Sequence, residues 1–267
     1  MKYADFIEPI AILAHEAGEA ILEVYATDFV VQSKSDESPL TQADLASQQR
    51  ITAKLKDLTP DIPIISEESD LPLFDERRKW QCYWLIDPLD GTREFVNRNG
   101  EFTVNIALIE AGRPVFGVVH VPVQQKTYIG CEGHGAELRD RGGSPLEVHV
   151  ADTSCMPVRV VGSRSHRGAS LDAFLASLGA HDFVPMGSSL KFCAVAEGTA
   201  DVYPRLGPTS EWDTAAAQAV VEQAGGAVLQ LDGKPLSYNQ KSDILNPWFV
   251  VLGPMDRDWL ALLSNGE

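Results

Sequence analysis

Between residues 101 and 150 the chain is a succession of short apolar runs separated by turns, a pattern that is typical of an antiparallel sheet. The runs EFTVNIALI and PVFGVVHV are joined by the turn sequence EAGRP, and KTYIG, AELR and LEVHV follow behind glycine-rich turns. Two apolar runs further upstream, IPII (62–65) and YWLI (83–86), predict two more buried strands. A large sheet is therefore expected in the first part of the chain.

The segments that precede these strands have helical periodicity. Residues 5–27 place Ile7, Ile10, Ala14, Ala17, Ile21 and Leu22 on one stripe, which predicts an amphipathic helix. Residues 38–58 predict a second helix with Thr41 as its N-cap. The first half is thus expected to hold two helices and an antiparallel meander.

Beyond about residue 156, predicted strands and helices alternate, which indicates an α/β arrangement. Strands are expected in VRVVG, DFVPM, ADVYP, AVLQL and WFVVL, and helices in SLDAFLASLG, SLKFCAVAEG, DTAAAQAVVEQAGG and MDRDWLALL. The change from successive strands to alternating strands and helices predicts two parts of the chain, residues 1–153 and 154–267.

The charge and cysteine content exclude some classes of protein. A net charge of -16 argues against a partner that is a nucleic-acid polymer, since such binders present a basic face. An anionic substrate would need bound cations or a local basic pocket. The four cysteines are isolated, no basic and apolar signal peptide opens the chain, and no run is long enough to span a bilayer. We therefore expect a cytoplasmic protein without a transmembrane segment.

The stretch LIDPLDGTREF (85–95) places two carboxylates directly behind a buried strand. Pro88 favours an extended Asp87, which is expected at the end of the strand, and Gly91 permits a turn that returns Asp90 toward it. With the Leu89 carbonyl, three hard oxygen donors converge, as Mg²⁺ prefers. An ordinary Asp-Gly turn is the alternative for this motif alone. An EF-hand loop is excluded, because Leu89, Gly91 and Arg98 would occupy its ligand positions.

Other acidic residues extend this constellation. Glu67 follows the strand at 62–65, and Asp213 precedes a predicted helix. Taken singly, Glu67 could be a solvated loop charge, Asp213 an N-cap, and Asp44 a solvated residue of its helix. Taken together, carboxylates about 4 Å apart would repel by about 4 kcal/mol at an effective dielectric of 20, and divalent ions would remove that cost. Two or three Mg²⁺ held in this way are typical of phosphoryl transfer to water.

The motifs LIDPLDGTREF and EWDTAAAQ resemble the two signatures of the inositol monophosphatase superfamily of Mg²⁺-dependent, lithium-sensitive phosphatases. The longer runs DPLDGTREFVNRNGEFTVNIALIEAG and YPRLGPTSEWDTAAAQAVVEQAGG resemble its bacterial 3'(2'),5'-bisphosphate nucleotidases. The resemblance implies an α/β sandwich (α+β) with the layered αβαβα architecture of the inositol monophosphatase and fructose-bisphosphatase type. Residues 1–153 would then be the metal-binding half, and residues 154–267 would complete the active site and the nucleotide pocket.

The resemblance also assigns roles on the metal side. One Mg²⁺ would be held by Glu67, Asp87 and the Leu89 carbonyl, and a second by Asp87, Asp90 and Asp213. Glu67, Thr92 and Asp44 would be catalytic, with Thr92 and Asp44 acting as a pair that takes a proton from the attacking water. The amides of Gly91 and Thr92 would face the phosphate at the start of a helix through REFV.

A second group of residues is implied for the nucleotide. Ser163 and His166 in VGSRSHRG would line the adenosine pocket, and the segment MGSSLK would contact base or ribose phosphate. Arg205 in YPRLG would take the second phosphate. Helix caps at the serines and surface positions for the histidine and lysine are the structural alternatives. The implied substrate-binding set is Glu67, Leu89, Asp90, Gly91, Thr92, Ser163, His166, Gly187, Ser188, Lys191, Arg205 and Asp213.

The implied activity is hydrolysis of adenosine 3',5'-bisphosphate to AMP and phosphate, with the 3'-phosphate of the sulfated nucleotide as a further substrate, in sulfate assimilation. One alternative within the fold is an inositol or sugar monophosphatase. A second, of another class, is a metal or nucleotide sensor without turnover, which the intact Asp44, Thr92 and Glu67 set disfavours. The chain is expected as a monomer or homodimer, and any membrane contact would be peripheral, on the cytoplasmic face of the inner membrane.

Overall fold

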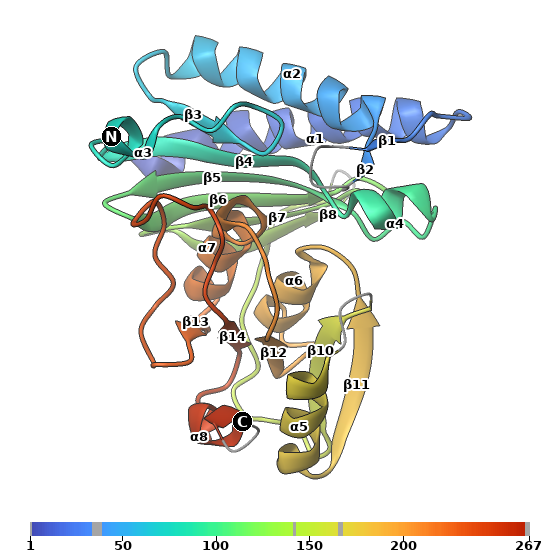
Figure 1. The fold of residues 1–267 in the computed structure, drawn as a ribbon, viewed down its shortest axis with the longest axis vertical. Helices are drawn as coiled ribbons and strands as arrows, with labels where there is room; N and C mark the ends of the chain where they lie inside the picture. The colour runs from blue at the N-terminus through green and yellow to red at the C-terminus, as the bar shows by residue number, and fades with distance from the viewer. Residues whose placement is uncertain (1, 34–38, 141–142, 165–167, 265–267) are drawn as a thin grey trace.

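The computed structural model describes residues 2–33, 39–140, 143–164 and 168–264, and it stacks helices and sheets in five layers (Figure 1). Helices α1 (Ile7–Tyr25) and α2 (Gln42–Leu58) cover one face of a seven-stranded sheet. Two helices, α6 (Leu190–Ala196) and α7 (Ala215–Gln223), lie between that sheet and a five-stranded sheet. Beyond the second sheet lie α5 (Ala169–Leu178) and α8 (Trp259–Ser264). The predicted αβαβα sandwich is confirmed.

The large sheet has the order β3-β4-β5-β6-β7-β8-β9. Its first pair, β3 and β4, is parallel, and the remaining pairs form the expected antiparallel meander. The strands are β3 (Ile64–Ser66), β4 (Cys82–Asp90), β5 (Thr103–Glu110), β6 (Arg113–Val121), β7 (Lys126–Cys131), β8 (Gly135–Asp140) and β9 (Leu146–Glu147). Short elements at the edges are η1 (Tyr3–Phe6), β1 (Gln32–Ser33), β2 (Pro39–Leu40), α3 (Phe74–Arg77) and α4 (Thr92–Val96).

The small sheet has the order β11-β10-β12-β14-β13 and is mixed. Its strands are β10 (Val158–Ser163), β11 (His181–Met186), β12 (Val202–Arg205), β13 (Ala227–Gln230) and β14 (Phe249–Leu252). Strand β10 runs parallel to β11 and β12, whereas β14 runs antiparallel to β12 and β13. The division of the chain at residues 153 and 154 stays a prediction. Among the described residues, no helix combines the length and apolarity that crossing a bilayer requires.

Strand β5 illustrates how residue alternation builds this stack. Val104, Ile106 and Leu108 face the core under α1 and α2, whereas Ala107 and Ile109 face α7. A strand with both faces buried favours apolar residues at nearly every position, and all of 103–109 is buried, with Thr103 and Asn105 as its two polar residues. A third core lies between the small sheet and the outer helices α5 and α8.

Two elements are shorter than expected. The helix predicted in MDRDWLALL begins at Trp259, because the Asp258 carboxylate caps it by accepting from the Ala261 amide at 3.0 Å. Asp256 lies before this cap and accepts from the amide and hydroxyl of Ser154 at 2.7 and 2.6 Å. The strand predicted in LEVHV pairs with β8 only at Leu146 and Glu147. From there the chain turns toward α7, where the Val150 amide donates to the Ala224 carbonyl.

The large sheet carries a buried histidine directly under α1. His120 is fully buried on β6, its Nδ1 lies 2.8 Å from the Thr127 hydroxyl, and its Nε2 has no hydrogen-bond partner among the residues that the structure describes. A Cβ at Gly18 on α1 would lie 2.7 Å from that Nε2, so glycine makes room for the ring. Burial, followed by the neighbouring His15, lowers the pKa of His120 from 6.5 to about 3.

His120 is therefore expected to make the protein less stable in acid. The folded pKa of His120 lies below its unfolded pKa. The contribution of the neutral imidazole to the free energy of unfolding is therefore fully present above pH 6.5 and is lost as the pH falls from 6.5 toward about 3. By pH 4.5 the loss is about 3 kcal/mol. Urea unfolding of wild type and His120→Gln across this range measures it, since glutamine cannot be protonated, and His181→Gln at the surface is the control. Parallel curves for wild type and His120→Gln would contradict the assignment.

Candidate active site

Strand β4 carries the first two carboxylates into the site. The strand does not end at Asp87, as the sequence suggested, but continues to Asp90 with a register shift against β5 between the two aspartates. Two hydrogen bonds stabilise the backbone at this register shift. The Leu89 amide donates to Asp87 Oδ1 at 3.0 Å, and the Ser47 hydroxyl donates to the Pro88 carbonyl at 2.7 Å. Gly91, with φ at +93°, then turns the chain into α4.

Two further carboxylates approach Asp87 from other elements. Glu67 follows β3, the parallel neighbour of β4, and Asp213 ends the short helix η2 (Glu211–Asp213). Oxygens of Glu67, Asp87 and Asp213 lie within 4.8 Å of one another. Asp213 is not the N-cap of α7, because Thr214 holds that position and the Asp213 carboxylate instead accepts from the Ser210 amide at 2.9 Å.

These carboxylates destabilise one another's charge in the absence of a cation. Burial, and then the charges of Glu67, Asp90 and Asp213, raise the pKa of Asp87 well above its ordinary value. Burial and the charges of Asp90 and Glu67 likewise raise the pKa of Asp213. A set of buried carboxylate oxygens in mutual repulsion fits hard divalent cations, which accept oxygen ligands and neutralise this charge.

Asp44 and Thr92 form a hydrogen-bonded pair beside this cluster. Asp44 is buried in the first turn of α2, so the alternative of a solvated helix residue is wrong. Its Oδ2 closes a capping box with the Thr41 amide and hydroxyl, both at 2.7 Å, which confirms Thr41 as the cap. Its Oδ1 accepts from the Thr92 hydroxyl at 3.3 Å. The helix cap therefore fixes the carboxylate that faces Thr92.

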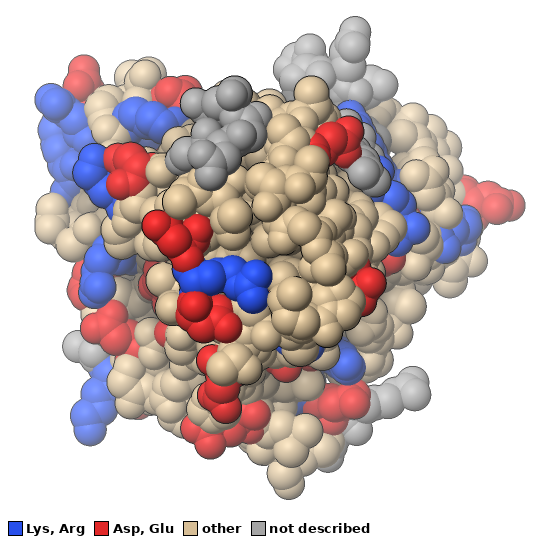
Figure 2. Space-filling view, turned by 90° about the horizontal axis from the view of Figure 1, so that it is seen from below, with Lys and Arg blue, Asp and Glu red and all other residues tan. Residues whose placement is uncertain are grey.

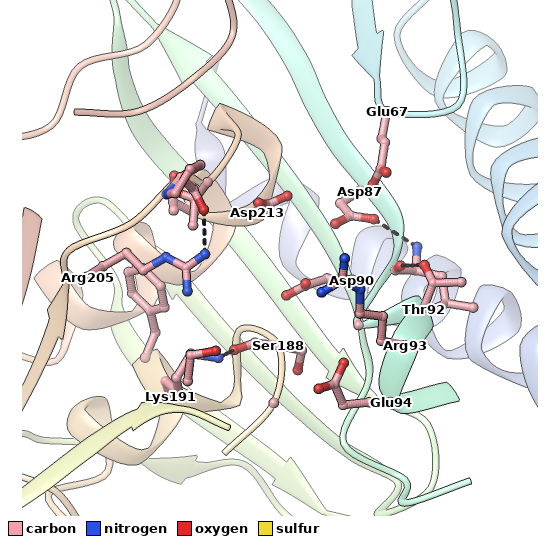
Figure 3. Close-up of a pocket in the computed structure, with 18 of the residues that line it drawn as sticks. Glu67, Asp87, Asp90, Thr92, Arg93, Glu94, Ser188, Lys191, Arg205 and Asp213 are labelled. Carbon is pink, nitrogen blue, oxygen red and sulfur yellow. Dashed lines mark hydrogen bonds between the residues drawn. The ribbon is translucent and has the colours of Figure 1, made fainter. Parts of the chain in front are cut away.

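The opposite wall of the site is cationic (Figure 3). Lys191 on α6 is buried, donates to the carbonyls of Ser188 and Met186 at 2.5 and 3.2 Å, and lies over the ring of Tyr203. Burial lowers its pKa to about 8, so it stays mostly protonated at neutral pH. Arg205, at the end of β12, points into the site and donates to the Pro208 carbonyl.

The turn 187–189 joins the two walls. The Gly187 amide donates to a Glu101 oxygen at 2.7 Å, and a Cβ at Gly187 would lie 2.6 Å from Glu94 Cγ. Ser188 has a positive φ of 44° and is not the N-cap of α6, a position held by Ser189. The Ser188 hydroxyl accepts only a long hydrogen bond of 3.5 Å from the Leu190 amide, so the alternative that Ser188 caps α6 is wrong.

One pocket of about 280 Å³ gathers the predicted residues. Asp44 stands behind Thr92 rather than in the wall, and His166 lies outside the described residues. Predicted residues in the lining are Glu67, Asp87, Leu89, Asp90, Gly91, Thr92, Ser163, Gly187, Ser188, Lys191, Arg205 and Asp213. The sequence interpretation missed Arg93, Glu94, Phe192, Tyr203, Pro208, Thr209 and Thr214. Tyr203 could have been found, because it precedes Arg205 by two positions on a strand and shares its face.

Known proteins are similar to this chain over most of its length. A family model described as the inositol monophosphatase family matches residues 4–253. The 3'(2'),5'-bisphosphate nucleotidase CysQ of Escherichia coli K12 is 49% identical over 247 residues, which cover 92% of this chain and 98% of the relative.

Solved structures share the fold. The crystal structure of CysQ from Bacteroides thetaiotaomicron, described as a bacterial member of the inositol monophosphatase family, superposes with a TM-score of 0.81 at 39% identity, covering 95% of this chain and 99% of that one. An IMPase/NADP phosphatase complexed with Mg²⁺ and phosphate superposes with a TM-score of 0.80, covering 98% and 95%. At 18% identity, this second structure shows the fold alone.

Proposed function

Because the chain belongs to the inositol monophosphatase family, we propose that it is a 3'(2'),5'-bisphosphate nucleotidase that hydrolyses adenosine 3',5'-bisphosphate to AMP and phosphate. The observation that carries the proposal is a pocket with carboxylates and Arg93 on one side and two cationic side chains, Lys191 and Arg205, on the other (Figure 3). A substrate with two phosphates needs both walls, one for the ester that is cleaved and one for the phosphate that stays.

The carboxylate wall would hold Mg²⁺. Glu67, Asp87 and the Leu89 carbonyl are the proposed ligands of one ion, and Asp87, Asp90 and Asp213 those of a second. When bound, the ions supply positive charge against the phosphate oxygens and so stabilise the charge of the transition state. The donor set supports this, because it consists of carboxylate and carbonyl oxygens only.

Thr92 and Asp44 are suited to move the proton of the attacking water. The Thr92 hydroxyl donates to Asp44 Oδ1, so its oxygen can accept a proton from water as its own proton passes to the carboxylate. The water oxygen then bonds to phosphorus opposite the 3'-oxygen, whose bond to phosphorus breaks. That oxygen takes up a proton from a solvent water, and the proton held by Asp44 returns to solvent. Gly91 and Thr92 begin α4 at the pocket, where their backbone would face the phosphate.

Arg205 and Lys191 are proposed to bind the 5'-phosphate. Arginine and lysine make charge-assisted hydrogen bonds to phosphate, and these two lie in a chain whose net charge is -16. On the face seen in Figure 2, lysine and arginine side chains lie scattered among acidic and uncharged ones, so this face has no continuous basic surface of the kind that binds a nucleic-acid polymer. A cytoplasmic location, a peripheral membrane contact and a monomeric or homodimeric state stay predictions.

Phosphate release with Mg²⁺ tests the function directly. Adenosine 3',5'-bisphosphate is expected to be hydrolysed with a much higher kcat/KM than inositol 1-phosphate, and lithium is expected to inhibit. A preference for the inositol ester would retain the metal site and reject the nucleotide pocket. No release from either compound would favour a sensor over an enzyme.

Substituting Arg205→Gln is expected to reduce kcat/KM for adenosine 3',5'-bisphosphate by roughly 10- to 100-fold, the worth of a hydrogen bond to a charged group. For adenosine 3'-monophosphate, which has no 5'-phosphate, the change should be under about 3-fold, because the lost partner is not there. Kinetics with both nucleotides measure the difference. Arg78→Gln, which removes an exposed arginine paired with Asp75, is the control. Equal losses for the two nucleotides would contradict a role in binding the 5'-phosphate.

A further inference from the structure

A buried serine connects the two walls of the pocket. Ser189 lies at the start of α6, and its hydroxyl oxygen is 2.7 Å from Asp90 Oδ2 and 3.1 Å from the backbone oxygen of Asp213. The side chain is 1% exposed, so water does not compete for these contacts. One hydroxyl thus touches two of the residues proposed to hold Mg²⁺, one of them at its carboxylate.

A second buried side chain fixes the direction of this hydroxyl. Asn105 stands opposite Asp87 in the register of β4 and β5, and its Nδ2 donates to the Ser189 oxygen at 2.7 Å. The other end of its amide accepts from the Thr103 hydroxyl at 3.2 Å. Since Ser189 accepts from the amide, its single proton is directed at Asp90, the nearer acceptor, or at the Asp213 carbonyl.

We propose that Ser189 is a positioning residue for Asp90, and that Asn105 acts through it by setting the direction of its hydroxyl. The proposal rests on the metal site of the proposed function. A carboxylate that accepts a hydrogen bond on Oδ2 is fixed in rotation and presents Oδ1 to a cation. Without this bond, repulsion from the neighbouring carboxylates would favour other rotamers of Asp90.

The arrangement also explains two polar residues that the sequence interpretation left unused. Thr103 and Asn105 alternate with the apolar residues Val104 and Ile106 on β5, and they stand on the face that carries Ala107 and Ile109 further along. That face is buried, so an asparagine there requires hydrogen-bond partners. The partners are the Thr103 hydroxyl and Ser189.

Mg²⁺ binding by Ser189→Ala tests the proposal. The Mg²⁺ concentration that half-saturates binding, followed by calorimetry without substrate, is expected to rise 10- to 100-fold, the usual cost of losing a partner of a metal ligand. The rate of phosphate release at saturating Mg²⁺ should fall by less than that factor. Thr199→Ala, which removes a hydroxyl that caps the end of the same helix by bonding to the Ala194 carbonyl, is the control and should bind like wild type.

The role of Asn105 is tested by a double-mutant cycle. Asn105→Ala is expected to shift the Mg²⁺ midpoint in the same direction by a smaller factor, and the double variant should equal Ser189→Ala alone. A midpoint within twofold of wild type for Ser189→Ala, or additive effects in the cycle, would overturn the proposal. A chain that binds Mg²⁺ but hydrolyses no nucleotide would reject the proposed function and leave this test intact. A wild type that binds no Mg²⁺ would overturn both.

Discussion

Replacing Asp87 with asparagine is expected to lower phosphate release by at least roughly 1,000-fold, because Asp87 is proposed to contact both ions. Stabilisation of transition-state charge by a metal amounts to several kcal/mol, and about 4 kcal/mol corresponds to three decades in rate. Asparagine keeps the acceptor for the Leu89 amide, so the local backbone should be retained. Single-turnover release of phosphate from adenosine 3',5'-bisphosphate at saturating Mg²⁺ measures the loss.

The same substitution should not weaken the fold. The folded state raises the pKa of Asp87, so ionisation of this carboxylate destabilises the metal-free protein as the pH rises above the unfolded value of 3.8. The asparagine side chain carries no such charge, and the free energy of unfolding of Asp87→Asn in EDTA at pH 7 is expected to be equal to or above that of wild type. Mg²⁺ should then stabilise the wild type and have little effect on the variant.

Asp232→Asn removes an exposed carboxylate paired with Lys234 and provides the control for both measurements. It should change neither phosphate release nor the response to Mg²⁺. If Asp87→Asn kept more than about a tenth of the wild-type rate, the loss would fall short of the effect of a metal ligand. The metal assignment would then be wrong. A lower free energy of unfolding in EDTA would contradict the electrostatic argument.

Gly117→Ala is expected to destabilise the protein by about 3 kcal/mol, near the upper end of the range for overpacking. A Cβ at Gly117 on β6 would lie 2.3 Å from the Ala216 carbonyl oxygen, and one at Gly130 on β7 would lie 2.4 Å from that of Ala219. The obstacle is the backbone of α7, which cannot move aside as a flexible side chain does. Urea or thermal unfolding measures the loss, and Gly130→Ala should behave in the same way.

Gly117→Ala should also affect the metal site. Helix α7 begins two residues after Asp213, so a helix pushed away from the sheet carries that carboxylate with it. We expect Gly117→Ala to raise the Mg²⁺ requirement of phosphate release as well as to lower stability. Gly168→Ala is the control, because a Cβ there meets no atom of the described residues within 4 Å, and only the smaller cost of alanine at the N-cap of α5 is expected. Wild-type stability in Gly117→Ala would show that the sheet and the helix can separate at little cost.

The order and type of the longer elements could be predicted from local patterns, whereas the short elements β1, β2 and α3 and some element ends could not. Periodicity placed α1 and α2, and alternation placed β5 and β6. The extension of β4 past Asp87 escaped prediction because proline and two aspartates are poor strand formers. Pairing with β5 across a register shift overrides that local preference.

The pocket residues were likewise predicted only in part. The motifs LIDPLDGTREF and EWDTAAAQ pointed to Asp87 and Asp213, whose carboxylate oxygens do lie together with those of Glu67, and to Asp90, which lines the same pocket. Their roles as ligands stay a prediction. Ser189 lies in MGSSLK and Asn105 in the longer run that begins DPLDGTREF, but neither motif assigned these two residues a role. Their meeting depends on two segments 84 residues apart, and it could be seen only after folding.

The sequence by itself determined most of the longer helices and strands, because periodicity and turn residues act over a few neighbours, and it determined which residue types could bind a divalent ion. Only the tertiary structure decided which atoms face one another. The capping box that orients Asp44 toward Thr92, the glycines that let α7 approach the sheet, and the hydroxyl that holds Asp90 all result from packing between distant segments. Such contacts depend on distances of a few tenths of an ångström, which close packing fixes and local sequence patterns do not encode.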